Sequence, residues 1–330
     1  MAVSAAAALA LVVPVGSAVG EPNPASGPHP TSAAIVTADL GSGTYGAFAE
    51  SMAALPDGRL LVSVTDWNTN MAGEGTANLG RLVAVDPVTG QTEPFGDIDV
   101  GKYGMQSGVT VAADGRVYVA AAFTGDGGDQ AAVYRVPEHG TAVPVMTLPA
   151  YAFPNGLVVD GTDIYATDSL WGAVWKGSTT GLTTDAELWF MADELAPAPP
   201  HKRYPTIGAN GIVVSAGGLL VTNWNTGSIY RIPIQSNGDH GALELVVTDP
   251  KLREADGITL DPAGRIWVAV NAGRGTLAVV DGGTVHVTRT QNGWLDYPTQ
   301  PVLIDETMYV VSGSYFGGTP FVTAFGGLIG

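Results

Sequence analysis

Short apolar segments alternate with tight polar turns along most of the chain, and the same arrangement occurs six times. Each copy starts with a polar residue, continues as an apolar segment, turns, and continues as a second apolar segment. The first copy spans residues 50–64 (ESMAALPDGRLLVSV) and the second spans 107–120 (SGVTVAADGRVYVA). An Asp-Gly pair joins the two segments in both copies, which is typical of a β-hairpin. The pattern therefore predicts paired short strands.

Three later copies resemble one another more closely: 155–167 (NGLVVDGTDIYAT), 210–222 (NGIVVSAGGLLVT) and 256–269 (DGITLDPAGRIWVA). In a weaker sixth copy, 300–311 (QPVLIDETMYVV), proline replaces the glycine. The six leading positions are separated by 57, 48, 55, 46 and 44 residues. A repeat of about 50 residues is typical of one four-stranded blade of a β-propeller. We therefore expect an all-β fold, a six-bladed β-propeller.

A ring of blades has an open edge unless a strand from one terminus completes the blade at the other. Residues 33–40 (AAIVTADL) precede the first copy and include a short apolar segment. We expect them to be the outer strand of the last blade, beside strands near 301–304, 308–312 and 321–325. This closure predicts a single domain over residues 33–330.

The N-terminal region has a different composition. Residues 5–19 are apolar but too few to span a bilayer, and small residues at 16–18 (GSA) are suited to signal peptidase. We interpret residues 1–18 as a signal peptide, although no Lys or Arg precedes the apolar segment. Residues 19–32, rich in Pro, Ser and Gly, are interpreted as a flexible lead. These features predict a secreted protein.

Composition restricts the chemistry that the chain can perform. The 330 residues include 45 Gly and 22 Pro, which suits many short strands and turns, and no Cys. Without cysteine, disulfides, thiolate metal sites and cysteine nucleophiles are excluded, so a metal must bind to oxygen or imidazole. A formal net charge of −17 disfavours nucleic acid and anionic membranes as partners. The acidity requires no special site, because solubility is a sufficient reason for most of it.

In a propeller the first strand of each blade lines the central tunnel, so the six leading residues gather around one axis. Two of them are carboxylates and two are carboxamides, which are oxygen donors that suit calcium and its flexible coordination. Polar residues also line water-filled tunnels, but buried unpaired carboxylates are costly without a positive charge between them. We therefore predict a divalent-cation site, most simply Ca²⁺, within the ring Glu50, Ser107, Asn155, Asn210, Asp256 and Gln300. The predicted metal ligands are Glu50, Asn155, Asn210 and Asp256.

Glycine follows three of the ring residues, at Gly156, Gly211 and Gly257. Glycine permits either a close approach of neighbouring backbone or a positive φ angle. The sequence leaves both explanations open.

Three segments carry a resemblance to a known family: 153–160 (FPNGLVVD), 167–171 (TDSLW) and 255–269 (ADGITLDPAGRIWVA). The chain resembles the senescence-marker-protein/gluconolactonase family and related calcium-dependent six-bladed propellers, including paraoxonases, phosphofluoridases and strictosidine synthase-like proteins. The resemblance implies that Glu50, Asn155 and Asp256 hold a catalytic metal. Paraoxonase-like and phosphofluoridase-like members add a further asparagine, which Asn210 matches.

The resemblance implies a hydrolase that acts on a lactone or related ester, with the cation polarising the carbonyl group of a small-molecule substrate. Asp256 is the first candidate for the catalytic base and Glu50 the second. Paraoxonases also have a histidine pair above the metal, which the five histidines here do not evidently form: His29, His139, His201, His240 and His286. The alternatives are a strictosidine synthase-like or other non-hydrolytic enzyme, and a secreted binding protein that calcium stabilises.

Substrate contacts are expected on the loops at the face where the inner strands begin. The candidate substrate-lining residues are Ser107, Gln300, Asp168, Trp171, Trp224, His201 and Tyr315. For each aromatic residue among them, packing between blades is an equally good explanation.

Overall fold

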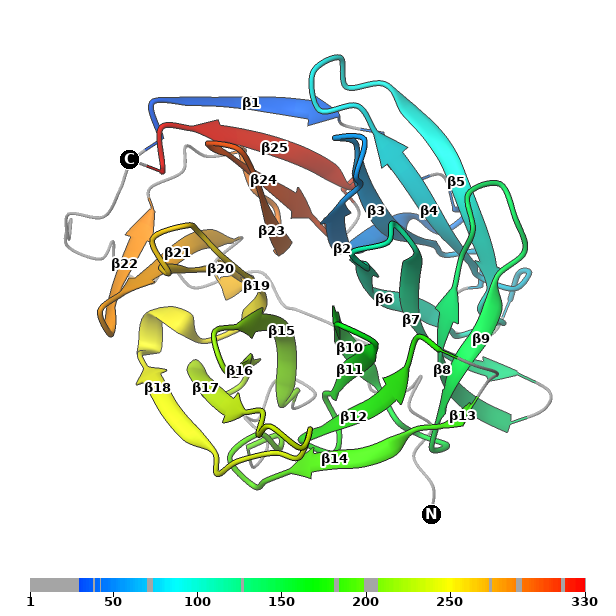
Figure 1. Ribbon diagram of the computed structural model, residues 1–330. Helices are drawn as coiled ribbons and strands as arrows, with labels where there is room; N and C mark the ends of the chain where they lie inside the picture. The colour runs from blue at the N-terminus through cyan, green and yellow to red at the C-terminus, as the bar shows by residue number, and fades with distance from the viewer. Residues whose placement is uncertain are drawn as a thin grey trace.

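In a computed structural model of the protein, six antiparallel sheets surround a central axis, as Figure 1 shows. The structure describes residues 30–37, 39–41, 43–69, 74–125, 128–180, 184–198, 207–272, 275–288, 293–315 and 318–329. No α-helix occurs among these residues. The predicted all-β fold with six blades is confirmed.

The first five blades each contain four strands that follow one another in sequence and in space. The strands of blades 1 to 3 are β2 (Ala47–Ala54), β3 (Leu60–Asp66), β4 (Leu79–Val85) and β5 (Thr92–Asp99); β6 (Met105–Val111), β7 (Val117–Gly125), β8 (Gly128–Arg135) and β9 (Val143–Leu148); and β10 (Pro154–Asp160), β11 (Asp163–Asp168), β12 (Ala173–Ser178) and β14 (Glu187–Met191). Blades 4 and 5 comprise β15 (Ala209–Ser215), β16 (Gly218–Asn223), β17 (Ser228–Pro233) and β18 (Glu244–Thr248); and β19 (Ala255–Leu260), β20 (Ile266–Val270), β21 (Thr276–Asp281) and β22 (Thr284–Thr288). The short β13 (Thr184–Asp185) extends blade 2 by pairing parallel to β9.

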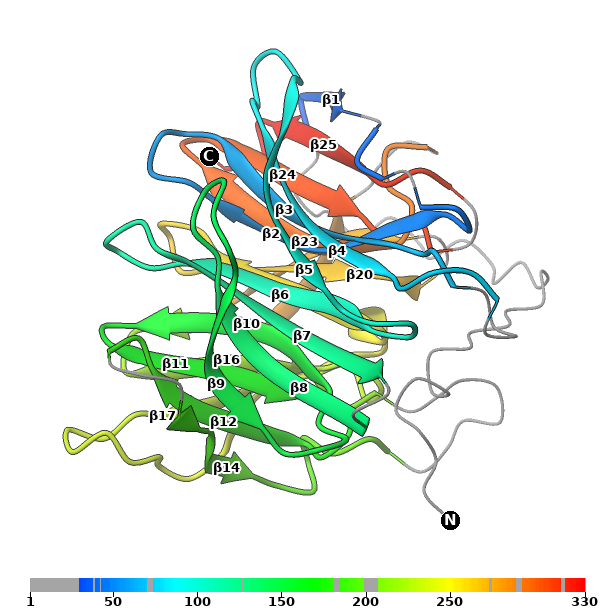
Figure 2. The same cartoon turned by 90° about the vertical axis from the view of Figure 1, so that its right-hand side faces the viewer.

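The sixth blade is built from both ends of the chain. Its strands β23 (Pro298–Ile304), β24 (Thr307–Ser312) and β25 (Phe321–Gly326) are completed by β1 (Ser32–Thr37), which pairs antiparallel with β25. Figures 1 and 2 both show β1 alongside β25. The predicted closing strand is therefore confirmed, and it begins one residue earlier than expected.

The predicted signal peptide, residues 1–18, lies outside the described residues, so that interpretation and the secretion it implies stay predictions. Within the described chain, no helix has the length and apolar character needed to cross a membrane.

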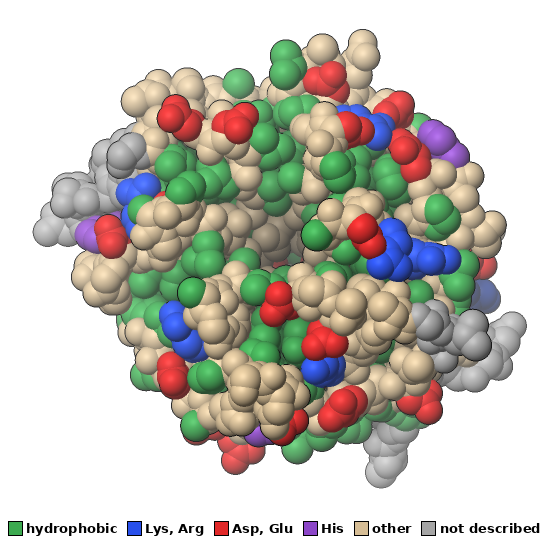
Figure 3. All heavy atoms as spheres, in the orientation of Figure 1, with side chains coloured by type: hydrophobic (Ala, Val, Ile, Leu, Met, Phe, Trp, Pro, Cys, Tyr) green, Lys and Arg blue, Asp and Glu red, His purple; other side chains and the backbone are tan. Residues whose placement is uncertain are grey.

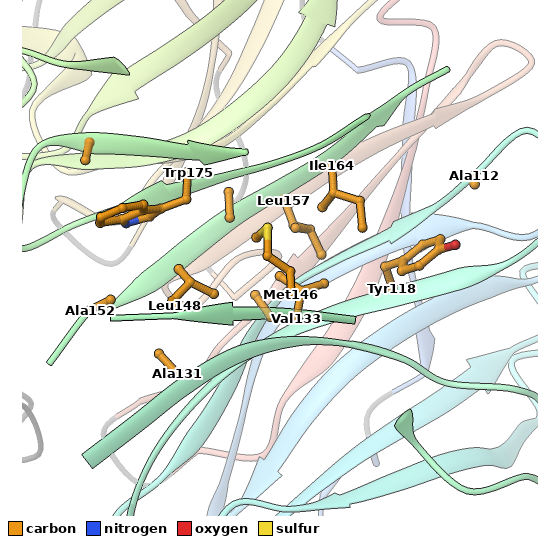
Figure 4. Close-up of a cluster of buried hydrophobic side chains, with 13 residues drawn as sticks. Ala112, Tyr118, Ala131, Val133, Met146, Leu148, Ala152, Leu157, Ile164 and Trp175 are labelled. Atoms are coloured by element: carbon orange, nitrogen blue, oxygen red, sulfur yellow. The ribbon is translucent and has the colours of Figure 1, made fainter. Parts of the chain in front are cut away.

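Both faces of each blade pack against a neighbouring blade. In β3, Leu60, Val62 and Val64 pack toward the sixth blade, whereas Leu61 packs toward the second. Because successive residues of a strand point to opposite faces, a strand covered on both sides has a continuous apolar sequence. Six apolar clusters fill the six interfaces between blades, and Figure 4 shows the one between blades 2 and 3.

Each inner strand departs from regular pairing near its start. In β10 the register shifts between Pro154 and Leu157, so Asn155 and Gly156 have no paired residue on β11. Comparable shifts occur near the starts of β2, β6, β15, β19 and β23. A bulge redirects the local backbone, and here it occurs at five of the six positions that the repeat places on the axis. In β23 the unpaired residue is Thr299, so the predicted ring position Gln300 is wrong by one residue.

The glycines after the ring residues allow neighbouring blades to approach closely. A Cβ atom on Gly156 would lie 2.5 Å from the carbonyl oxygen of Asn210, and one on Gly211 would lie 2.3 Å from that of Asp256. Neither glycine has a positive φ angle. Close approach is therefore the reason for glycine at these positions.

Candidate metal centre

Hydroxyl groups connect the inner strands to neighbouring blades near the ring. Thr167 Oγ1 donates to the carbonyl oxygen of Asn210 at 2.5 Å, and Thr222 Oγ1 donates to that of Asp256 at 3.0 Å. Similar bonds connect Ser63 to Ser107 and Thr299 to Ala49. Since these bonds join strands of neighbouring blades, the ring is held by rigid elements rather than by loops.

The central tunnel contains a cavity of about 150 Å³. Its wall includes Glu50, Asn155, Asn210, Asp256 and Gln300, so the structure brings all four predicted ligands to one cavity. Apolar side chains of the inner strands form much of the remaining wall, among them Met52, Leu157, Ile212 and Ile258. Figure 3 shows the molecule hollowed at its centre, with acidic side chains distributed over the surrounding blades.

The two ring carboxylates, Glu50 and Asp256, are only 8% and 4% exposed. Burial raises the pKa of Glu50 from 4.5 to about 7. Burial and the negative charge of Glu50 raise the pKa of Asp256 well above its ordinary value. Neither carboxylate forms an ion pair with any Lys, Arg or His in the described residues. Burying two carboxylates without a compensating positive charge costs free energy, and a bound metal cation would supply that charge.

The two asparagines use their amide nitrogens and leave an oxygen available. Asn155 Nδ2 donates to Ser169 Oγ at 3.1 Å, and Ser169 Oγ donates to the carbonyl oxygen of Ala209 at 2.7 Å. The Asn210 amide hydrogen-bonds to Asp256 and lowers its pKa. The Oδ1 atom of Asn210 is buried and has no hydrogen-bond partner in the structure as described. A buried oxygen without a donor is unusual, and it is the kind of atom that a cation binds.

Neutral groups orient both carboxylates. Tyr315 Oη donates to Glu50 Oε2, and Asn271 Nδ2 donates to Asp256 Oδ2 at 3.3 Å. These donors fix the carboxylates without cancelling their charge. The resulting donor set of two carboxylates and two amide oxygens fits Ca²⁺.

Nitrogen ligands are missing from the ring. No cluster of three or more His, Asp or Glu that would hold a metal is found across the described ranges. The ring itself contributes only two acids and completes its donors with amides. An all-oxygen set favours a hard cation over zinc.

Two other predicted ring positions have different roles. Ser107 Oγ donates to the carbonyl oxygen of Pro154 at 2.6 Å, so this side chain connects blades 2 and 3. Gln300 lines the cavity, and its Nε2 donates to the carbonyl oxygens of Ile258 and Pro301 at 3.1 and 3.0 Å.

Asp168 is fully buried at the turn after β11. Its Oδ1 accepts from the backbone N–H groups of Leu170 and Trp171 at 3.0 and 3.1 Å. Its Oδ2 accepts from Trp175 Nε1 at 3.0 Å. With both oxygens engaged, Asp168 stabilises its own turn.

The aromatic candidates lie at different depths. Trp171 is 42% exposed, whereas Trp224 is 9% exposed. Tyr315 packs on Phe48, with ring centroids 5.6 Å apart, in an apolar cluster that also contains Phe153. His201 lies outside the described residues. Tyr315 is thus placed beside Glu50, and the substrate roles of these residues stay predictions.

Two residues of the site were missed by sequence reasoning. Ser169 and Asn271 directly follow β11 and β20, the second strands of their blades, and they contact Asn155 and Asp256. Both residues occupy the same place in the repeat, and this place could have identified them as neighbours of the ring. The end of the second strand lies beside the start of the first, where the ring residue is.

No family model and no curated protein matches the sequence. Among solved structures, a proposed gluconolactonase has a TM-score of 0.59 at 16% identity, covering 90% of this chain and 93% of that chain. A proposed oxidoreductase (glucose dehydrogenase) of Thermus thermophilus has a TM-score of 0.56 at 15% identity, covering 89% of this chain and 99% of that chain. A virginiamycin B lyase of Staphylococcus aureus has a TM-score of 0.52 at 11% identity, covering 87% of this chain and 98% of that chain. At these identities the similarities show the fold, and their different activities show that the fold does not determine the reaction.

Proposed function

We propose that the chain is a calcium-dependent hydrolase that opens a lactone or a related ester within its central tunnel. The observation that carries the proposal is the ring of Glu50, Asn155, Asn210 and Asp256 around one cavity. Its two buried carboxylates have no cation of their own within the described chain, and one buried amide oxygen has no donor. A bound Ca²⁺ would satisfy all three groups at once.

The four ring residues would hold the cation, which when bound supplies positive charge that polarises a carbonyl group. The chain itself supplies a candidate base. Asp256 Oδ2 accepts from Asn271 at 3.3 Å, and burial together with the charge of Glu50 raises the pKa of Asp256, which increases its basicity. In the proposed reaction the water proton moves to the Asp256 carboxylate as the water oxygen bonds to the carbonyl carbon. The ester C–O bond then breaks, and Asp256 returns the proton to the leaving alkoxide oxygen, which gives the hydroxy acid.

The lactone class is supported by the similarity to a proposed gluconolactonase. Secretion fits the same proposal. Extracellular modules bind calcium with dissociation constants of about 0.1 to 1 mM, so a site with two carboxylates is strong enough outside the cell.

The test is a calcium titration of metal-stripped protein, followed by thermal unfolding and by turnover of lactones, aryl esters and phosphotriesters. We expect calcium to raise the melting temperature and to be required for hydrolysis of at least one substrate class. Full hydrolysis in the presence of excess chelator would contradict the role of the cation. Stabilisation by calcium without any turnover would instead favour the binding-protein alternative.

A further inference from the structure

Asn271 is a buried residue, 7% exposed, that connects three blades. It follows β20 in blade 5, and its Oδ1 accepts from Trp224 Nε1 of blade 4 at 3.0 Å. Its Nδ2 donates to the carbonyl oxygen of Pro298 in blade 6 at 2.8 Å and to Asp256 Oδ2 at 3.3 Å. Both ends of the Asn271 amide are therefore engaged.

The partners determine which way the amide points. An indole N–H can only donate, and a backbone carbonyl can only accept. Reversing the Asn271 amide would place its NH₂ group against Trp224 Nε1 and its oxygen against two acceptors, the Pro298 carbonyl oxygen and Asp256 Oδ2. The tryptophan thus keeps an N–H of Asn271 directed at the carboxylate.

A second buried asparagine, Asn223 of blade 4, has a different set of partners. Asn223 is the last residue of β16 and lies one position before Trp224, the residue that occupies the place of Asn271 in blade 4. Its Oδ1 accepts from the backbone N–H groups of Asn225 and Thr226 at 3.0 and 3.1 Å. Its Nδ2 donates to the carbonyl oxygens of Glu194 and Ala196 at 2.9 and 3.1 Å. Asn223 thus binds backbone groups of surrounding loops, whereas Asn271 binds a ring carboxylate.

We propose that Asn271 is a positioning residue that sets the direction in which Asp256 faces the tunnel, and that Trp224 acts on Asp256 through Asn271. The inference rests on the proposed calcium site, since its readout is calcium affinity. A carboxylate with one fixed oxygen reaches a cation without a further loss of conformational freedom. Residues that orient metal ligands in this way commonly contribute about 10-fold to 100-fold in metal affinity.

The experiment compares two variants with two matched controls. Asn271→Leu removes the amide, and Trp224→Phe removes the N–H that orients it. Asn223→Leu removes another buried amide, one that binds backbone groups of neighbouring loops. Trp175→Phe removes a buried indole N–H that donates to Asp168 Oδ2 at 3.0 Å. The dissociation constant for calcium is measured by isothermal titration calorimetry, and unfolding is measured separately in chelator.

We expect Asn271→Leu to weaken calcium binding by about 10-fold or more and Trp224→Phe by roughly 3-fold to 10-fold. The controls should stay within about 2-fold of wild type even where they lower stability. The double variant should bind calcium no more weakly than Asn271→Leu, because both changes act through one amide.

Several outcomes would overturn the inference. If wild type binds calcium and neither Asn271→Leu nor Trp224→Phe differs from its control, Asn271 has no positioning role. If Asn271→Leu does not fold, Trp224→Phe decides the matter alone. If wild type shows no calcium binding, the proposed function fails first and the assignment of Asn271 fails with it.

Discussion

Two buried aspartates, Asp256 near the start of β19 and Asp261 directly after its end, have opposite environments. Asp261 pairs with Arg265 at 2.6 Å and accepts from Trp267 Nε1 at 2.9 Å. It also accepts from the backbone N–H groups of Ala263 and Arg265, both at 3.0 Å, and these bonds together with the arginine hold its pKa below the ordinary value despite burial. Asp256, five positions earlier, receives neutral donors, and its pKa is raised by burial and by Glu50.

The difference separates an acid that stabilises the fold from the acid that we propose as a metal ligand. A buried carboxylate that stabilises the fold is compensated by a cation and by several donors supplied by nearby residues. Asp256 lies at the same depth without such compensation in the described chain, and it shares a cavity with a second acid, Glu50. The missing positive charge is therefore more informative than the presence of an acid.

The largest effect is expected from Asp256→Asn. Loss of one of the two proposed carboxylate ligands should abolish calcium-dependent stabilisation, and turnover should fall by on the order of a thousandfold, since a bound cation contributes several kcal/mol to charge stabilisation. Thermal unfolding with and without calcium and steady-state kinetics measure both effects. Calcium binding equal to that of wild type would show that the site lies elsewhere.

Asp261→Asn should have the opposite pattern. Removing the partner of Arg265 breaks an ion pair whose acid is fully buried, so we expect the free energy of unfolding to fall by about 3 kcal/mol. Calcium affinity should stay unchanged. Urea denaturation in chelator compares the two variants directly. Without metal, Asp256→Asn removes the repulsion between Asp256 and Glu50, so the free energy of unfolding should be equal to that of wild type or higher. If both variants lost stability equally, the contrast between the two acids would be wrong.

The pH dependence of metal-free stability tests the uncompensated pair. The folded-state pKa of Glu50 is about 7, above its ordinary 4.5, so the folded state retains a proton that the unfolded state releases between these values. The contribution of Glu50 to metal-free stability should therefore be greatest below pH 4.5 and fall by roughly 2 to 3 kcal/mol as the pH rises to 7. Denaturation curves at several pH values measure this loss. Glu50→Gln should reduce the slope, and an unchanged slope would assign it to other groups.

The propeller and its ring could be predicted because both depend on the repeat. A period of about 50 residues and the alternation within each strand place Asn155, Asn210 and Asp256 at one register position, and the six interfaces follow from apolar runs on both faces. This part of the site is a property of the backbone, which sequence periodicity determines.

The groups that orient the ring could not be predicted, because they depend on how individual side chains turn. Asp168, Asn223 and Asn271 all lie at the end of a second strand or directly after it. Yet Asp168 and Asn223 bind neighbouring loop or turn groups, and Asn271 turns to Asp256. Ser107 has the register of a ligand, but its short side chain reaches the carbonyl of the next blade. Packing decides among these hydrogen bonds.

The smallest effect is expected from removing the hydroxyl group of Tyr315, which donates to Glu50. Tyr315→Phe removes the hydroxyl bound to Glu50 Oε2 and keeps the ring packed against Phe48. A hydrogen bond to the charged carboxylate lowers its pKa, so its loss should raise the pKa of Glu50 further and weaken calcium binding about 3-fold to 10-fold at neutral pH. Calorimetric titration measures the change, with the exposed Tyr45→Phe as control. Because Tyr315 is neutral, its removal should cost far less than Asp256→Asn, and an equal loss would mean that the hydroxyl itself belongs to the metal site.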